Sequence, residues 1–227
     1  MRELNYHLNV GKILRESFDI ILRKPVILLP MFIVLLFDRI IYFVTLSFFD
    51  SAGKVIPLLT ASLIPLFLFI IIYPVLEGMY LLMVKNILEN KEIELNNAFS
   101  LVLKKAQLLI TAGILIDLII FAGILLLIVP GVIFAIRYFY TIPAIMLENH
   151  GVLDGMRASK EFASDKKIKT FLFLLIPLLL SLFGDLGTRF VFSSFQIASE
   201  TARFVFSLII FSWFAIIPAY VYIKKEI

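Results

Sequence analysis

The stretch LLLIVPGVIFAIRY, Leu125 to Tyr138, decides how the chain is laid out. It interrupts a long apolar run with a Pro-Gly pair, and an arginine follows six residues later. One continuous helix over Ala106–Glu148 would be about 65 Å long, roughly twice the thickness of the hydrocarbon core of a bilayer. Two spans are therefore required. Pro130-Gly131 supplies the turn chemistry between them, because proline presets φ and glycine allows a positive φ.

The composition places the whole chain in the membrane class. Of its 227 residues, 61% are hydrophobic and 17% are charged, whereas a soluble domain has about 45–50% apolar and about 25% charged residues. Charge-free runs at 55–76, 118–136 and 204–223 approach or exceed the roughly 20 residues that cross a bilayer as a helix. We therefore expect an all-α integral membrane protein, with residues 1–227 forming a single polytopic domain.

Six spans divide the chain best. Five of them cover about 25–49, 55–84, 106–129, 131–148 and 203–223. The remaining one, span 5, begins near Ile168 and has two possible ends. It stops at Phe183–Gly187, or it continues through the next eight residues with Asp185 and Arg189 one helical turn apart as an internal pair.

The basic residues predict the orientation of these spans. Six spans place the N-terminal segment, two loops and the C-terminal tail on one side, and these hold most of the 21 lysines and arginines. They are Arg2, Lys12, Arg15, Arg23, Lys24, Lys85, Lys91, Lys104, Lys105, Arg157, Lys160, Lys166, Lys167, Lys169, Lys224 and Lys225. The opposite side receives Lys54, Arg189 and Arg203. We expect a multi-pass plasma-membrane protein with both termini cytoplasmic, in contact with anionic lipid headgroups and not with nucleic acid.

Each odd-numbered span is preceded by an amphipathic segment. Apolar residues recur at i, i+3, i+4 and i+7 over 10–21 and 95–106, and more weakly over 152–163. These segments predict helices that lie in the membrane interface or pack on one another. The chain then reads as three units, 1–90, 91–149 and 150–227, each an interfacial helix followed by a transmembrane hairpin. The alternative is that such elements recur here without a true triplication.

A spaced motif follows the Pro-Gly pair. Its residues are Pro130, Gly131, Arg137, Tyr140, Pro143, Glu148, Gly151, Gly155 and Ser159. This run resembles the six-span membrane domain fused to some glycerophosphodiester phosphodiesterases, and related uncharacterised bacterial and archaeal families. The resemblance implies a six-span fold and carries no assigned activity. The chain departs from the family pattern at Asp165 and Ile168, where a glycine and a tryptophan are usual. It holds no phosphodiesterase domain, so that chemistry does not transfer.

Several ionisable residues fall within or near the ends of the predicted spans. Near the bilayer centre such a residue costs at least about 2.5–3.5 kcal/mol, so it needs a partner or water. Those expected in the membrane are Asp38, Arg39, Asp117 and Arg137. They predict a buried polar cluster that orients the bundle or lines a path for an ion or headgroup. Alternatively, Arg137 snorkels to the outer headgroups. Glu77 and Glu148 are expected at the cytoplasmic interface, hydrogen-bonded to the adjoining amphipathic helices.

No catalytic motif stands out in the sequence. The chain has two histidines and no cysteine, and it lacks a Gly-X-Ser-X-Gly elbow, an HExxH pair and a P-loop. We therefore expect a non-enzyme without cofactor or metal. The first expectation for its role is a membrane scaffold or accessory protein that acts through its interfacial helices, as a homo-oligomer or in a complex. The alternative is a small transporter or lipid-handling protein that uses the intramembrane polar cluster.

Overall fold

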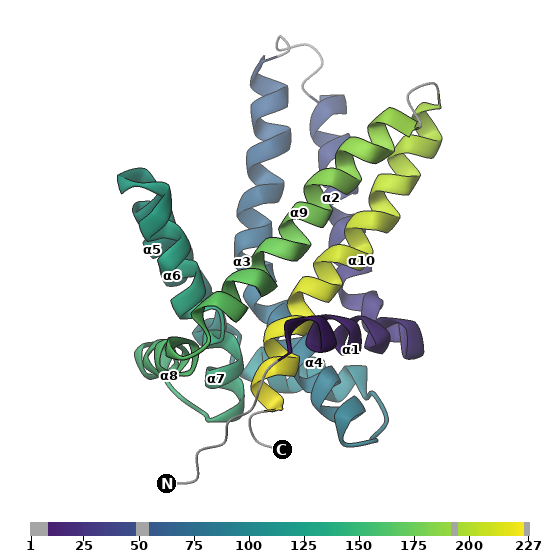
Figure 1. The fold of residues 1–227 in the computed structure, drawn as a ribbon. Coiled ribbons are helices and arrows are strands. Elements are labelled where there is room, and N and C mark those ends of the chain that lie inside the picture. Colours follow the sequence, from purple (N-terminus) through teal and green to yellow (C-terminus); the bar gives the residue numbers. More distant parts are fainter. Residues whose placement is uncertain (1–8, 49–54, 192–194, 225–227) are drawn as a thin grey trace, which may run out of the picture.

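A computed structural model describes residues 9–48, 55–191 and 195–224, and every regular element in these ranges is a helix (Figure 1). Among the described residues, five stretches are long and apolar enough to cross a membrane. A sixth is added if a sharply bent helix pair near the N-terminus counts as one span. The chain is therefore an all-α protein with five to six candidate membrane spans. Arg2, Lys54, Lys225 and the predicted end of the first span at residue 49 lie outside the described residues.

The helices lie where the hydrophobic pattern predicts them. The long ones are α2 (Leu29–Phe48), α3 (Val55–Leu88), α5 (Ala106–Leu126), α9 (Lys167–Val191) and α10 (Gln196–Ile223). The short ones are α1 (Val10–Arg23), η1 (Pro25–Leu28), α4 (Leu95–Lys104), α6 (Ile128–Tyr138), α7 (Thr141–Leu147) and α8 (Val152–Ser164). Of the two ends predicted for span 5, the shorter is wrong, because α9 continues past Gly187 to Val191. The longer one is confirmed as far as Val191, and residues 192–194 lie outside the described residues.

Consecutive helices pack against each other in three pairs, α2 on α3, α5 on α6 and α9 on α10. The α3 helix is central, since it also contacts α4, α5, α7 and α10. Glycines lie at the crossings, where the absence of a side chain lets two backbones approach closely. A Cβ on Gly123 of α5 would come within 2.9 Å of the backbone of Gly131 on α6, and one on Gly184 of α9 would overlap the ring of Phe206.

The predicted position of the turn after α5 is wrong by three residues. The helix breaks at Leu127, whose backbone is extended at φ −167° and ψ 149°, and α6 has already begun at Ile128. Pro130 and Gly131 thus lie in the first turn of α6. Proline is tolerated there because the first amide groups of a helix have no intrahelical acceptor. Gly131 is helical and buried against Ile120 and Ile124 of α5, so it serves the close approach of the two helices and not a positive φ.

The three predicted amphipathic helices are confirmed as α1, α4 and α8, and they gather at one end of the bundle (Figure 1). The α1 helix meets the first part of the following span at 99°. Its buried face packs on α10, where the Trp213 indole N–H donates to the Ser17 hydroxyl at 2.9 Å. Likewise α4 packs on α3, and α8 packs on α6 and α7. Their apolar faces are therefore used mainly to build the bundle.

A corner between α6, α7 and α8 accounts for much of the motif spacing. The Ser159 hydroxyl donates to the Arg137 carbonyl at 2.8 Å and accepts the Tyr140 amide N–H at 3.0 Å. It thereby satisfies two backbone groups freed by the break between α6 and α7, which apolar surroundings would otherwise leave costly. Pro143 lies in the first turn of α7, and Gly155 of α8 packs closely against Ile145. The spacing thus encodes a helix corner.

Candidate functional site: an interhelical cavity with two carboxylates

A cavity of about 260 Å³ lies between α3, α5, α6, α7, α9 and α10. Each of the three helix pairs borders it. The first pair contributes α3, the second contributes α5 and α6, and the third contributes α9 and α10. Most of its lining is apolar, and its polar groups are the side chains of Tyr73, Glu77, Asp117 and Tyr138. No lysine, arginine or histidine lines it within the described part of the chain. An internal cavity with a few convergent polar groups is the usual form of a binding site.

The crossing of α3 and α5 brings the two carboxyl groups to this cavity. Gly113 faces Pro74 so closely that a Cβ on the glycine would overlap the proline ring. Glu77 follows Pro74 by three residues on α3, and Asp117 follows Gly113 by four residues on α5. Residues three or four apart lie on the same face of a helix. The two helices run antiparallel, since Gly78 faces Leu109 while Pro74 faces Gly113. The acids therefore lie on opposite sides of the crossing along the helix axes, and both line the cavity.

The two carboxyl groups differ in exposure. The Glu77 side chain is buried at 9% exposure, whereas Asp117 is exposed on α5. Glu77 thus forms the floor of the cavity and Asp117 its rim. Within the described residues, neither has a hydrogen bond or an ion pair with a basic side chain. An ionised carboxylate in apolar surroundings is costly unless a cation or proton accompanies it, so a positive charge bound beside the buried Glu77 would lower that cost.

An apolar groove of about 400 Å³ adjoins the cavity, between α6, α9 and α10. The two share the side chains of Ala135, Leu174 and Phe214, which form a common wall between the groove and the cavity that holds the acids. Apart from Ser181, the side chains along the groove are apolar, and they include Pro177 inside α9. A molecule bound across both would place a hydrocarbon part in the groove and a polar part beside the carboxyl groups.

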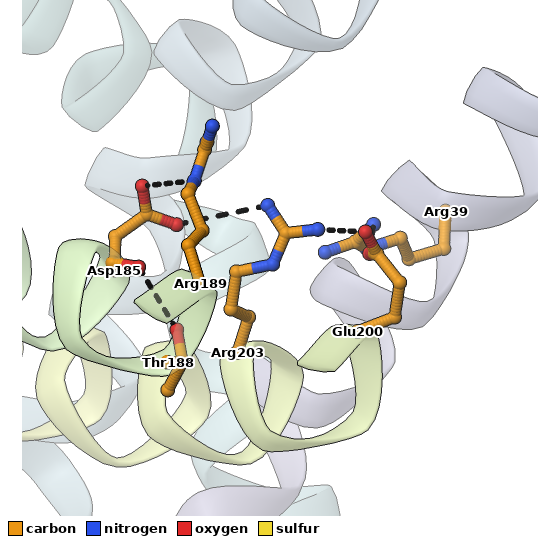
Figure 2. A network of polar contacts seen from close by, with 6 residues as sticks. All are labelled: Arg39, Asp185, Thr188, Arg189, Glu200 and Arg203. Carbon is orange, nitrogen blue, oxygen red and sulfur yellow. Dashed lines mark hydrogen bonds and ion pairs between the residues drawn. The ribbon is translucent and has the colours of Figure 1, made fainter. Parts of the chain in front are cut away.

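A second set of charged residues is paired internally (Figure 2). Arg39 of α2 contacts Glu200 of α10 at 3.0 Å, and Arg203 also pairs with Glu200. Arg203 then reaches Asp185 of α9 at 3.7 Å, and Asp185 pairs with Arg189 at 2.9 Å. We call Arg39, Asp185, Arg189, Glu200 and Arg203 the ion-pair chain. It ties α2, α9 and α10 together and leaves neither carboxylate without a cation.

The structure does not assemble the predicted four-residue cluster. Arg39 belongs to the ion-pair chain. Asp117 lines the 260 Å³ cavity together with Glu77, and we call this space the carboxylate cavity. Arg137 lines a different cavity, beside α8 and α9. Asp38 is the neighbour of Arg39 on α2, which packs chiefly on α3 and α10. The cause is rotation about the helix axes, since depth in a span follows from residue number and facing direction does not.

The two acids predicted at the interface also lie in different places. Glu77 lines the cavity and forms no hydrogen bond with an amphipathic helix among the described residues. Glu148 accepts a hydrogen bond from the Tyr222 hydroxyl of α10 at 2.6 Å and contacts His150 at 2.8 Å, so it is linked to a candidate span. Tyr73 and Tyr138 as lining groups, and Glu200 as a partner of Arg39, were not predicted from the sequence. For Glu77 there was one usable indication, a proline three residues earlier in the same span.

Comparison of the chain with protein-family models, curated proteins and solved structures gave no match. The resemblance to the phosphodiesterase-associated membrane domain therefore stays a prediction.

Proposed function

We propose that the chain spans the plasma membrane six times as three hairpins, with both termini in the cytoplasm. The gathering of α1, α4 and α8 at one end supports this topology, because these helices and their flanks carry most of the basic residues. The chain has no cysteine, so single cysteines report position cleanly. We expect Lys91→Cys and Lys160→Cys to react only with reagent on the cytoplasmic side, and Gly187→Cys only from outside. Labelling of all three from one side would overturn the topology.

Within this topology, we propose that the chain binds a small amphipathic cation in the carboxylate cavity and carries it across the membrane in exchange for protons. The observation that carries the proposal is the pair Glu77 and Asp117, two acids inside a membrane domain with no basic partner among the described residues. Acidic groups placed in this way bind protons or cations in membrane carriers.

The surroundings of the pair favour an amphipathic ligand over a bare ion. A small inorganic cation needs several oxygen ligands, whereas most of the cavity lining is apolar. The adjoining groove accepts an apolar body, and Tyr73 and Tyr138 offer aromatic faces and hydroxyl groups beside the acids. Aromatic faces attract organic cations. Charge recognition by the acids and burial of the hydrocarbon part in the groove would then act together.

The scaffold role expected from the sequence remains a second proposal. Interfacial helices that shape a membrane need a free apolar face. Buried side chains of α1, α4 and α8 contact the spans, which leaves less of each face for lipid. The exposed Phe99, Leu101 and Leu103 of α4 favour lipid contact, so that helix carries the strongest support for the scaffold role.

Ethidium uptake into proteoliposomes tests the carrier proposal. Ethidium is an amphipathic organic cation whose fluorescence rises on DNA enclosed in the vesicles. With an acidic lumen, the wild-type protein should accelerate uptake, since outward proton movement drives inward cation movement. Glu77→Gln should abolish the acceleration, and Glu200→Gln, which alters an acid of the ion-pair chain, should retain it. Uptake at the rate of protein-free vesicles would overturn transport. Binding without uptake would leave a cation-binding protein.

A further inference from the structure

A second cavity, of about 280 Å³, lies between α6, α8 and α9 and is lined by three basic side chains. Arg137 comes from the last turn of α6, Lys160 from α8, and Lys167 from the first turn of α9. We call this the basic pocket. Its remaining lining is Ile133, Ile136, Ala163 and Ser164. Two of the three cations thus come from the segment predicted to face the cytoplasm, and the third comes from a span.

The three cations are not neutralised within the described residues. None of them forms an ion pair there, although four other exposed bases do, namely Lys12, Lys91, Arg157 and Arg189. Asp165 lies beside the cavity and accepts a hydrogen bond from the lining residue Ser164 at 3.0 Å. Three bases and no acid are among the described lining residues, which leaves an excess of positive charge along the cavity wall. Like charges held together repel, unless an anion lies between them.

The position of the basic pocket narrows the kind of anion. Lys167 begins α9, and the N-terminal end of a helix carries partial positive charge and amide groups that favour phosphate. Ile133 and Ile136 of α6, which belongs to a candidate span, give the pocket an apolar wall. A ligand with a phosphate group beside the bases and hydrocarbon beside this wall matches both halves. Basic pockets between helices at the cytoplasmic surface bind lipid headgroups in this manner.

We propose that the basic pocket is a phosphate-binding site, filled by the headgroup of an anionic phospholipid from the inner leaflet. The bilayer supplies this ligand at high local concentration. Arg137 contributes from below the surface, with a planar guanidinium suited to paired hydrogen bonds with phosphate oxygens. Lys160 and Lys167 contribute point charges at the rim, where both are exposed. The bound headgroup would also brace α6 against α8 and α9.

Native mass spectrometry of the detergent-purified protein with added phosphatidylglycerol or phosphatidylcholine tests the site. Each Lys or Arg near an anionic lipid contributes about fivefold in affinity. The triple variant Arg137→Gln/Lys160→Gln/Lys167→Gln should therefore bind phosphatidylglycerol about a hundredfold more weakly, and phosphatidylcholine as the wild type does. Lys169→Gln, on the same helix but outside the pocket, serves as the matched control and should bind both lipids like the wild type.

Two further arms keep the outcome decisive. If the triple variant unfolds at a lower temperature, the exposed single variant Lys160→Gln should still lose about fivefold in phosphatidylglycerol affinity. Inorganic phosphate is titrated separately. Binding of phosphate that depends on the same three side chains, without a preference for phosphatidylglycerol, would keep the site and assign it to free phosphate. Equal phosphatidylglycerol and phosphate binding by wild-type and triple-variant protein would overturn the proposal.

Discussion

The carboxylate cavity and the ion-pair chain each contain two carboxyl groups, and they differ in whether basic side chains pair with them. In the ion-pair chain, Asp185 and Glu200 face three arginines, and successive contacts link α2, α9 and α10. In the cavity, Glu77 and Asp117 face no base among the described residues. An acid that already has its cation gains little by binding another. The comparison therefore separates charges that hold helices together from charges left available to a ligand.

The largest effect is expected from neutralising the cavity acids. The double variant Glu77→Gln/Asp117→Asn should lower ethidium affinity by at least about a hundredfold, since each charge-assisted contact is worth about 1.5–3 kcal/mol. Its folding should be unharmed or improved, because two carboxyl groups without partners are removed from the membrane. Fluorescence titration in detergent measures the affinity, and thermal unfolding measures the stability.

The matched control for that experiment is Asp185→Asn/Glu200→Gln in the ion-pair chain. It also removes two carboxylates, but these are paired with the arginines of the ion-pair chain. The protein should therefore become less stable, while its ethidium affinity should stay within about twofold of the wild type. If this control loses ethidium binding while the cavity variant retains it, the roles of the two regions are reversed.

A smaller but still large effect is expected at the crossing that positions the cavity. A side chain on Gly113 would overlap Pro74. Gly113→Leu should therefore push α5 from α3, lower the free energy of unfolding by about 1–3 kcal/mol, and weaken ethidium binding. Gly187→Leu is the control, since a side chain there meets no other atom within 4 Å. Equal stability of the two variants would show that the crossing is not tight.

The positions of the helices could be predicted from the sequence, whereas the set of residues that line the carboxylate cavity could not. Apolar spacing placed α1, α4 and α8, because one buried face repeats every 3.6 residues. The pair Asp185 and Arg189 was also predictable, since residues one turn apart on one helix are neighbours. Which span faces which is a different problem. Asp117 and Arg137 sit on adjacent helices, yet they line different cavities.

The position of the break between α5 and α6 also depends on tertiary packing and not on the Pro130-Gly131 dipeptide alone. The dipeptide is typical of turns, but proline is equally suited to the first turn of a helix and glycine to a tight helix crossing. Local residue preferences did not distinguish these roles. Gly131 packs closely against Gly123 and Ile124 of α5. This tertiary contact favours a helical Gly131, and the break between α5 and α6 then lies at Leu127.

A moderate effect is expected at the centre of the ion-pair chain. Arg203 has 21% of its side chain exposed and contacts both Asp185 and Glu200. Arg203→Met should lower the free energy of unfolding by about 1–2 kcal/mol, the range for polar contacts between membrane helices. Arg157→Met is the control, because the ion pair of Arg157 with Asp154 is largely exposed and should contribute less than about 1 kcal/mol. Chemical unfolding in detergent compares the two.

The smallest effect concerns α1 and the C-terminal end of α10. Glu16 accepts a hydrogen bond from the Tyr220 hydroxyl at 2.6 Å, and Lys224 lies 3.1 Å away. The hydrogen bond from Tyr220, followed by the contact with Lys224, holds the pKa of Glu16 below its ordinary value of 4.5. A lowered pKa in the folded state stabilises the protein above pH 4.5, and this stabilisation is lost as the pH falls through the lowered value.

Thermal unfolding between pH 3 and pH 7 checks this linkage. Glu16→Gln should show a shallower loss of stability below pH 4.5 than the wild type, with a difference that closes as both forms become neutral at that position. Glu161→Gln, at an exposed position on α8, should follow the wild-type curve. A Glu16→Gln curve parallel to the wild type throughout would show that the Tyr220 hydrogen bond does not link the pKa of Glu16 to stability.

The central claim is that the cavity acids exchange protons for a cation, and proton release on binding measures this directly. Ethidium is added to detergent-solubilised protein in weakly buffered solution at neutral pH, with a pH indicator dye present. We predict release of about one proton for each ethidium bound, because the two compete for the same carboxyl groups. Glu200→Gln should release the same amount and Glu77→Gln/Asp117→Asn none. Ethidium binding without proton release, or release that persists in the double variant, would contradict the account.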